Sequence, residues 1–239
     1  MGRRRVGHRL GCAALLLLLL PGRGPATVRA EPSPSPDALW EIVGTCIAGR
    51  GADYCACPAF ARSCCDDLRR PDREVVWARE PDFVAIQDMK ACGCDPSFVA
   101  GLALPRTRVS GIEDPRRPEG IWPFAWRVAQ GRIRDPSTIA LAINPATART
   151  QRQMHVHILR LRPDARARLL ALPTGVEADG VIVVRLASLD AVFGAAIAAV
   201  GADRIGDQGI LVFAAPSGGF RAVLTDRASP QRFTMNDCR

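Results

Sequence analysis

Hydrophobic residues recur along this chain with two different spacings, and each spacing predicts one kind of element. Apolar and β-branched runs broken by Pro and Gly predict strands. Apolar residues three and four positions apart predict helices. The strands expected are 74–78, 82–88, 97–105, 137–144, 153–161, 180–186, 209–215 and 220–225, and the helices are 38–49, 121–133, 163–172 and 188–201. Asp37 and Ser188 stand where helix N-caps are expected, and Gly201 where a helix ends.

Short connections join two pairs of these strands, and they indicate how the sheet is built. The run 153–161 follows 137–144 after the turn-rich "PATARTQR", which predicts an antiparallel pair. The segments 209–215 and 220–225 form a predicted hairpin across "PSGG". The mixture of strands and helices predicts an α+β fold, with an antiparallel sheet and helices packed on one side.

The N-terminus has a different pattern. Residues 1–30 contain an arginine-rich start, the apolar run "GCAALLLLLL" and small residues before a predicted cleavage after Ala30. This is typical of a secretory signal peptide, with an uncleaved membrane anchor as the alternative. The stretch 31–37 is a proline-rich spacer, and 38–239 is long enough for one domain with its own core.

The charge lies mainly in that leader. The chain has 32 basic and 24 acidic residues, and six of the basic ones but no acid fall within 1–30. The remainder therefore has a formal charge of only +2. Such a balance gives no reason to expect a nucleic-acid partner, which requires a basic face.

Eight of the nine cysteines follow the leader, and an even number in an exported chain predicts disulfides. The close pairs "CAC", "CC" and "CGC" leave a metal cluster as the alternative, but they lack the C-x-x-C spacing of tetrahedral zinc sites. The stretch 54–70 is expected to be a stapled loop in a disulfide-rich N-terminal region. Cys238 is expected to tie the C-terminal tail to the body, with Cys46 as one candidate partner.

The candidate chemistry lies in the strand "QMHVHIL". Successive residues of a strand point to opposite faces, so Gln153, His155 and His157 share one face. The alternate residues, Met154, Val156 and Ile158, are apolar and are expected to face the core. Two imidazoles about 6–7 Å apart on the open face can reach one phosphate or one metal ion.

Hydrogen-bond donors precede this strand. Asn144, Arg149, Thr150 and Gln151 lie on the connection leading into it, with no acid among them. Neutral donors and an arginine favour an anion as the ligand. A metal site would need a third ligand, and the strand offers only Gln153. Two solvent-facing histidines without a function remain the simplest alternative.

The segment "ARTQRQMHVHIL" resembles the histidine-triad (HIT) signature, H-x-H-x-H-x-x with apolar x. It resembles more closely the exported CDP-diacylglycerol pyrophosphatases, a branch of that superfamily. The segments "LWEIVGTC", "LALPRTRVSGIEDP", "IWPFAWRVA", "LAINPATARTQ", "HVHILRLRPDAR" and "RASPQRFTMNDC" are similar to that family in the same order. The block from Asn144 to Arg166 carries the resemblance most specifically.

The resemblance implies a HIT-like hydrolase that splits CDP-diacylglycerol into CMP and phosphatidate without a cofactor or metal. It implies that His155 is the nucleophile, forming a covalent nucleotidyl-histidine, and that His157 binds the phosphate oxygens. Asn144 and Thr150 fall near positions that hold the phosphate. The first triad histidine is replaced here by Gln153, which cannot shuttle protons.

The implied location is the periplasm, at the membrane surface where the nucleotide-lipid substrate lies, with an uncleaved leader as one means of attachment. Two other functions remain open at this point. One is a disulfide-stapled module that binds a nucleotide or phosphate without turnover. The other is a metal-dependent enzyme with His155 and His157 as ligands. The sequence does not indicate an oligomeric state.

Overall fold

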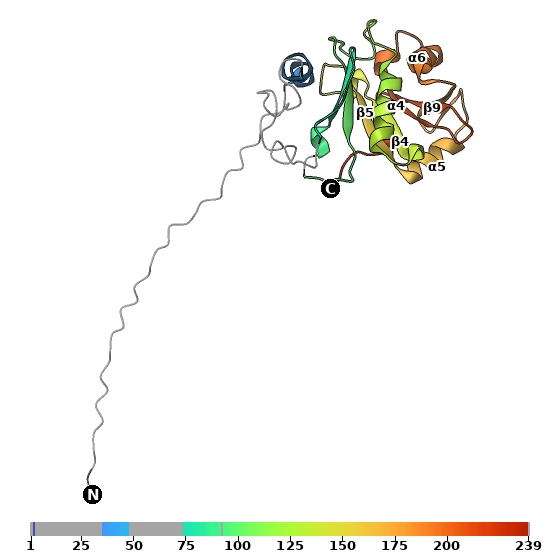
Figure 1. The fold of residues 1–239 in the computed structure, drawn as a ribbon. Coiled ribbons are helices and arrows are strands. Elements are labelled where there is room, and N and C mark those ends of the chain that lie inside the picture. The colour runs from blue at the N-terminus through green and yellow to red at the C-terminus, as the bar shows by residue number, and fades with distance from the viewer. Residues whose placement is uncertain (1, 3–34, 48–73, 92, 239) are drawn as a thin grey trace. The chain divides into compact units, whose positions relative to one another are not determined.

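The computed structural model describes residues 2, 35–47, 74–91 and 93–238 (Figure 1). The predicted signal peptide, most of the proline-rich spacer and the stretch 54–70 therefore lie outside the described residues. Among the residues described, no helix is both long and apolar enough to cross a bilayer.

A ten-stranded sheet organises the domain, with strand order β1-β2-β3-β5-β4-β8-β9-β7-β6 and every neighbouring pair antiparallel. The short β10 pairs with the end of β5. The strands are β1 (Val76–Arg79), β2 (Phe83–Gln87), β3 (Gly101–Pro105), β4 (Ile139–Ile143), β5 (Val156–Leu161), β6 (Glu177–Ala178), β7 (Val181–Leu186), β8 (Gln208–Ala214), β9 (Phe220–Asp226) and β10 (Thr234–Met235). The predicted β4–β5 pair and β8–β9 hairpin are both confirmed.

The predicted helices are also present. They are α1 (Ala38–Glu41), which continues as the π-helix η1 (Ile42–Ile47), α4 (Ile121–Arg132), α5 (Pro163–Ala171) and α6 (Val192–Val200). Single 3-10 turns include η4 (Met89–Ala91), η5 (Pro136–Thr138), η6 (Ala146–Ala148), η7 (Leu189–Ala191), η8 (Ile205–Asp207) and η9 (Pro230–Phe233). Gly201 ends α6 with φ +93°, a conformation that favours glycine.

The two predicted N-caps stand in place but do not cap through their side chains. Ser188 precedes η7 and makes no side-chain cap hydrogen bond. Asp37 precedes α1 and instead accepts a hydrogen bond from Arg108 at 2.9 Å. The start of α1 is therefore stabilised by contacts with other parts of the chain.

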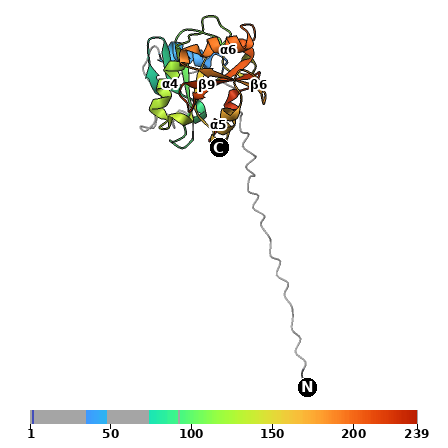
Figure 2. The same ribbon diagram turned by 90° about the vertical axis from the view of Figure 1, so that its right-hand side faces the viewer.

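The α+β antiparallel fold is confirmed, and helices lie on both faces of the sheet rather than on one (Figure 1 and Figure 2). Helices α4 and α6 pack on one face through Trp122, Phe124 and Phe193. The opposite face is covered by α1 and η1 at one end and by α5 at the other. The reason is that β2, β3 and β4 are buried along their whole length, so both of their faces are apolar.

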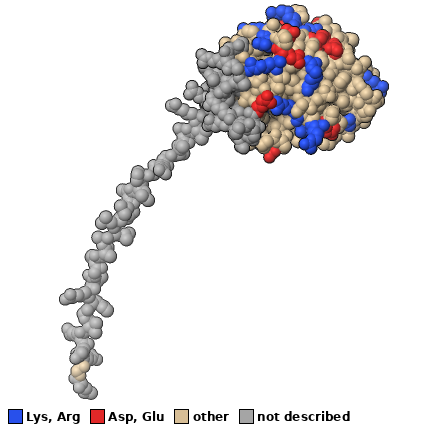
Figure 3. All heavy atoms as spheres, in the orientation of Figure 1, with Lys and Arg blue, Asp and Glu red and all other residues tan. Residues whose placement is uncertain are grey.

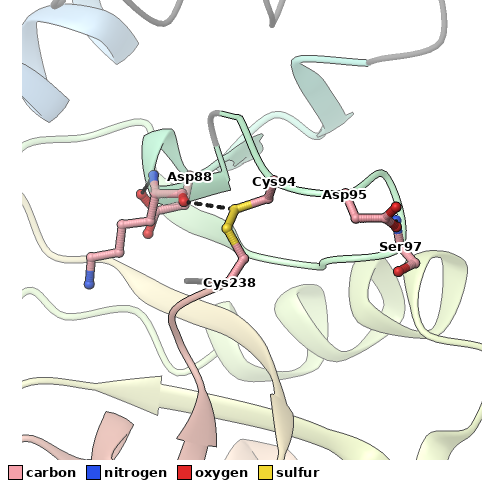
Figure 4. The surroundings of a disulfide bond; sticks show 6 residues. Asp88, Cys94, Asp95, Ser97 and Cys238 are labelled. Carbon is pink, nitrogen blue, oxygen red and sulfur yellow. Dashed lines mark hydrogen bonds between the residues drawn. A yellow bond between two sulfur atoms is a disulfide. The ribbon is translucent and has the colours of Figure 1, made fainter.

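One disulfide of the described residues joins Cys94 to Cys238, 144 positions apart (Figure 4). Cys238 thus ties the tail to the body, as expected, but Cys46 is not its partner. Cys46 is disulfide-bonded elsewhere. The bridge holds the chain just after η4 against the chain just after β10.

Candidate active site

The two histidines share one face of the sheet, as the alternation predicts. Met154, Val156 and Ile158 are buried in the cluster under α4. His155 directly precedes β5, and His157 lies within it, paired with Leu102 of β3 and Ala142 of β4. The two rings meet edge to face with their centroids 4.8 Å apart.

Both imidazoles line a pocket of about 320 Å³ on this face. One wall is apolar and comes from α1, η1, β2 and β3. The other wall is polar and comes from η4, the β4–β5 connection and η9. The lining residues are Ala38, Leu39, Ile42, Ile86, Gln87, Asp88, Met89, Lys90, Leu102, Asn144, Ala148, Thr150, Gln151, His155, His157 and Gln231.

His155 is held in one tautomer by its own chain. Its Nδ1 lies 2.8 Å from the carbonyl oxygen of Gln153, which accepts only, so Nδ1 carries the proton and Nε2 keeps a lone pair. Burial, and then the neighbouring His157, lower the pKa of His155 to about 3. The imidazole is therefore neutral at physiological pH and has an unprotonated nitrogen.

His157 is fixed through Gln231, which comes from η9. The Gln231 amide lies 2.9 Å from Nε2 of His157 and 3.1 Å from Nζ of Lys90. A lysine ammonium only donates, so the amide oxygen must face Lys90 and the amide nitrogen must face His157. Nε2 of His157 consequently accepts a hydrogen bond, and in the neutral ring the proton lies on Nδ1.

The carboxylate of Asp88 faces Nδ1 of His157, the nitrogen that carries the proton. Its Oδ2 is 3.7 Å from Nδ1 of His157, which is buried and has no hydrogen-bond partner within the described residues. Its Oδ1 accepts a hydrogen bond from the backbone N–H of Lys90 at 3.0 Å. Burial alone would raise the pKa of Asp88, but His157 and the Lys90 N–H hold that pKa below its ordinary value.

Two of the predicted phosphate-binding residues line the pocket with donors. Asn144 accepts a hydrogen bond from Ser229 Oγ at 2.7 Å through its amide oxygen, and within the described part of the chain its amide nitrogen is uncommitted. Thr150 is exposed and lines the pocket mouth. Together with Lys90, they line the same pocket as the histidines and supply groups that match phosphate oxygens.

The structure gives the other three predicted residues different partners. Gln151 lines the pocket, but its amide accepts from the Leu39 N–H at 3.1 Å and donates to the Ser35 carbonyl at 3.0 Å, which fixes the start of α1. Arg149 forms an ion pair with Glu113 and is not among the lining residues.

Gln153 turns away from the pocket into the loop after β3. Its amide donates to the carbonyls of Pro105 and Thr107, each at 2.9 Å, and accepts from the Val109 N–H at 3.3 Å. The side chain is almost fully buried. Gln153 therefore has a structural role, and only its backbone carbonyl takes part in the site.

Sequence reasoning missed Asp88, Lys90 and Gln231. Lys90 and Gln231 belong to two short turns, η4 and η9, which carry no periodic pattern, and Asp88 stands at the end of the predicted strand 82–88, directly before η4. One signal was available, because Lys90 is the only lysine in a chain otherwise rich in arginine.

The pocket offers an unprotonated imidazole nitrogen among amide, hydroxyl and ammonium donors, which suits a phosphoric ester or anhydride. Fold and pocket fit one class of protein, a hydrolase acting on phosphate linkages. More specifically, the chain belongs to the CDP-diacylglycerol pyrophosphatase family, whose model matches residues 34–179, more than half of its length. As a member of this family, the protein is an enzyme that hydrolyses the diphosphate bond of CDP-diacylglycerol. The alternative of a binding module without turnover is therefore set aside. Gln231 and Cys238 lie beyond the matched range.

Proposed function

We propose that hydrolysis proceeds in two steps through a nucleotide covalently bound to His155. The observation that carries this proposal is the hydrogen bond from Nδ1 of His155 to the Gln153 carbonyl, which leaves the Nε2 lone pair available. A neutral imidazole is a competent nucleophile without an adjacent base.

In the first step, Nε2 of His155 attacks the phosphorus of the CMP moiety. The bond from that phosphorus to the bridging oxygen breaks, and phosphatidate leaves with the electron pair. The leaving group is a phosphate monoester, which is a weak base and needs little general-acid help. In the second step water attacks the same phosphorus and releases CMP.

Donors in the pocket stabilise the charge that develops during these steps. Lys90 supplies a positive charge, and Asn144 and Thr150 supply neutral donors. Such preorganised donors in a partly desolvated pocket contribute most of the acceleration in many enzymes. The proposal requires neither a metal ion nor a cofactor.

We further propose that the enzyme works outside the cytoplasm, at a membrane surface. The leader pattern of residues 1–30 and the Cys94–Cys238 disulfide support this location. The substrate is a lipid, and the apolar wall of Leu39, Ile42 and Leu102 lies beside the polar part of the pocket. Basic and acidic side chains are interspersed on the face shown in Figure 3, in keeping with a partner other than a nucleic acid.

CMP release from CDP-diacylglycerol, with and without chelator, tests the chemistry. We expect an unchanged rate with chelator, no turnover by His155→Ala and normal folding of that variant. A chelator-sensitive rate would favour the metal-dependent alternative, and turnover by folded His155→Ala would contradict the nucleophile assignment.

A further inference from the structure

Nε2 of His157 is unprotonated and accepts the Gln231 amide N–H, and Nδ1 of the same ring faces the buried carboxylate of Asp88. We propose that Asp88 and His157 form a dyad in which Nε2 of His157 takes the proton from the water that hydrolyses the nucleotidyl-His155 intermediate. This inference rests on the proposed function and assigns the base for its second step. His157 is the catalytic residue of the pair, and Asp88 is a positioning residue.

The hydrogen bonds around His157 support the direction of this proton transfer. Gln231 donates to Nε2, so Nε2 is an acceptor in the resting enzyme rather than a donor to phosphate. Nδ1 is buried and faces Oδ2 of Asp88 at 3.7 Å. Protonating Nε2 would make the ring a cation, and a carboxylate behind it stabilises that cation. Catalytic hydrogen bonds are often long in the free enzyme and tighten when substrate is bound.

Asp88 is suited to this position because it is held in its ionised form. The carboxylate is almost fully buried on the protein side of the pocket and accepts the Lys90 N–H. The groups that face the dyad are His155, Lys90 and Gln231. The Lys90 ammonium is directed at the Gln231 oxygen, which polarises the amide toward Nε2 of His157.

No other lining group in the described residues is suited to activate water. The titratable side chains of the pocket are Asp88, Lys90, His155 and His157. His155 is bonded to the nucleotide in the intermediate, and Lys90 is a donor. Gln153 stands where a triad histidine would shuttle protons, but its side-chain amide is hydrogen-bonded to the backbone of the loop at Pro105–Val109.

The position of His157 fits a water molecule attacking at His155. The two rings are in edge-to-face contact with centroids 4.8 Å apart, so a phosphorus bonded to His155 would lie beside His157. In the step proposed, the water oxygen bonds to phosphorus and the phosphorus–Nε2 bond of His155 breaks. The electron pair of the broken bond returns to His155. The water displaces the Gln231 N–H from Nε2 of His157 and transfers its proton to that nitrogen, and the proton passes to solvent as CMP leaves.

The test separates the two products in time. Purified full-length enzyme is mixed with CDP-diacylglycerol in detergent micelles, and phosphatidate and CMP are followed from the first turnover. In Asp88→Asn we expect a rapid burst of phosphatidate approaching one per enzyme, and CMP release slowed about 100-fold, the order expected for loss of general-base catalysis. The matched control is Asp164→Asn, which removes an exposed aspartate paired with Arg162 and should behave as wild type.

Fluoride provides a readout that a merely structural role would not change. As a nucleophile without a proton, it needs no base, so it should restore nucleotide release from Asp88→Asn as cytidine phosphorofluoridate. The same pattern is expected for His157→Gln, which serves if Asp88→Asn does not fold. Equal slowing of both products without a burst, or no rescue by fluoride, would overturn the dyad. Absence of any protein-bound nucleotide in wild type and variants alike would instead contradict the covalent mechanism.

Discussion

The amide nitrogen of Gln231 lies 2.9 Å from Nε2 of His157, although the two residues are 74 positions apart in the chain. This contact determines which nitrogen of His157 holds the proton, because the Gln231 oxygen is directed to Lys90. The chemistry of the strand histidines therefore depends on two short turns, η4 and η9, which the Cys94–Cys238 disulfide holds together.

Removing the Gln231 amide should weaken catalysis without unfolding the protein. Gln231→Leu is expected to lower the rate constant for CMP release about five- to tenfold, since one hydrogen bond of about 1 kcal/mol is lost at the catalytic ring. Gln130→Leu, at an exposed position of α4, is the matched control and should retain the wild-type rate. An unchanged rate in Gln231→Leu would show that the amide does not position His157.

Gln153 should matter for stability rather than for proton transfer. Gln153→Leu leaves the Pro105 and Thr107 carbonyls and the Val109 N–H without their partner, so urea unfolding should show a loss of about 2–4 kcal/mol. Gln153→His completes the triad pattern formally, yet an imidazole cannot donate twice and accept once. It should also lose stability, and a faster enzyme of wild-type stability would contradict this role.

The disulfide should couple stability to activity. Replacing Cys94 and Cys238 together by serine is expected to cost about 2–4 kcal/mol in urea unfolding, because a long loop of the unfolded chain is no longer closed. CMP release should fall as well, since Asp88 and Gln231 lie within seven residues of the two cysteines. Ser97→Ala, which keeps the bridge and alters the same loop, is the control (Figure 4). Full activity of the double variant at low temperature would show that the disulfide is not needed to position the active-site residues.

Burial of neutral His155 should make the folded state sensitive to acid. The unfolded chain binds a proton at this residue below about pH 6.5, while the folded protein binds it only near pH 3. The unfolded state thus holds more protons in that window. The contribution of His155 to the free energy of unfolding therefore falls by about 1.4 kcal/mol per pH unit as pH decreases. The stability of wild type relative to His155→Gln should show this slope between pH 6 and 4. Parallel curves for the two proteins would contradict the lowered pKa.

The sequence predicts the fold and the facing of the histidines because both follow from periodicity. Alternation alone places His155 and His157 opposite Val156 and Ile158. It places Gln153 with them too. However, Gln153 precedes β5, where no strand pairing fixes the direction of its side chain, and the loop after β3 offers its amide three backbone hydrogen-bond partners. Asp88 and Gln231 were missed because tertiary contacts, not local patterns, bring η4 and η9 to the site. Eight cysteines allow on the order of a hundred pairings, so spacing could not select Cys94 for Cys238.

The nucleophile itself is tested most directly by trapping the intermediate. Wild-type enzyme and the Asp88→Asn variant are quenched within the first turnover of CDP-diacylglycerol, digested and analysed by mass spectrometry under conditions that preserve phosphoramidates. We expect a cytidylyl group on the peptide containing His155, bonded to that ring, and more of it in Asp88→Asn. Product accumulating at the normal rate while His155 remains unmodified throughout would contradict it.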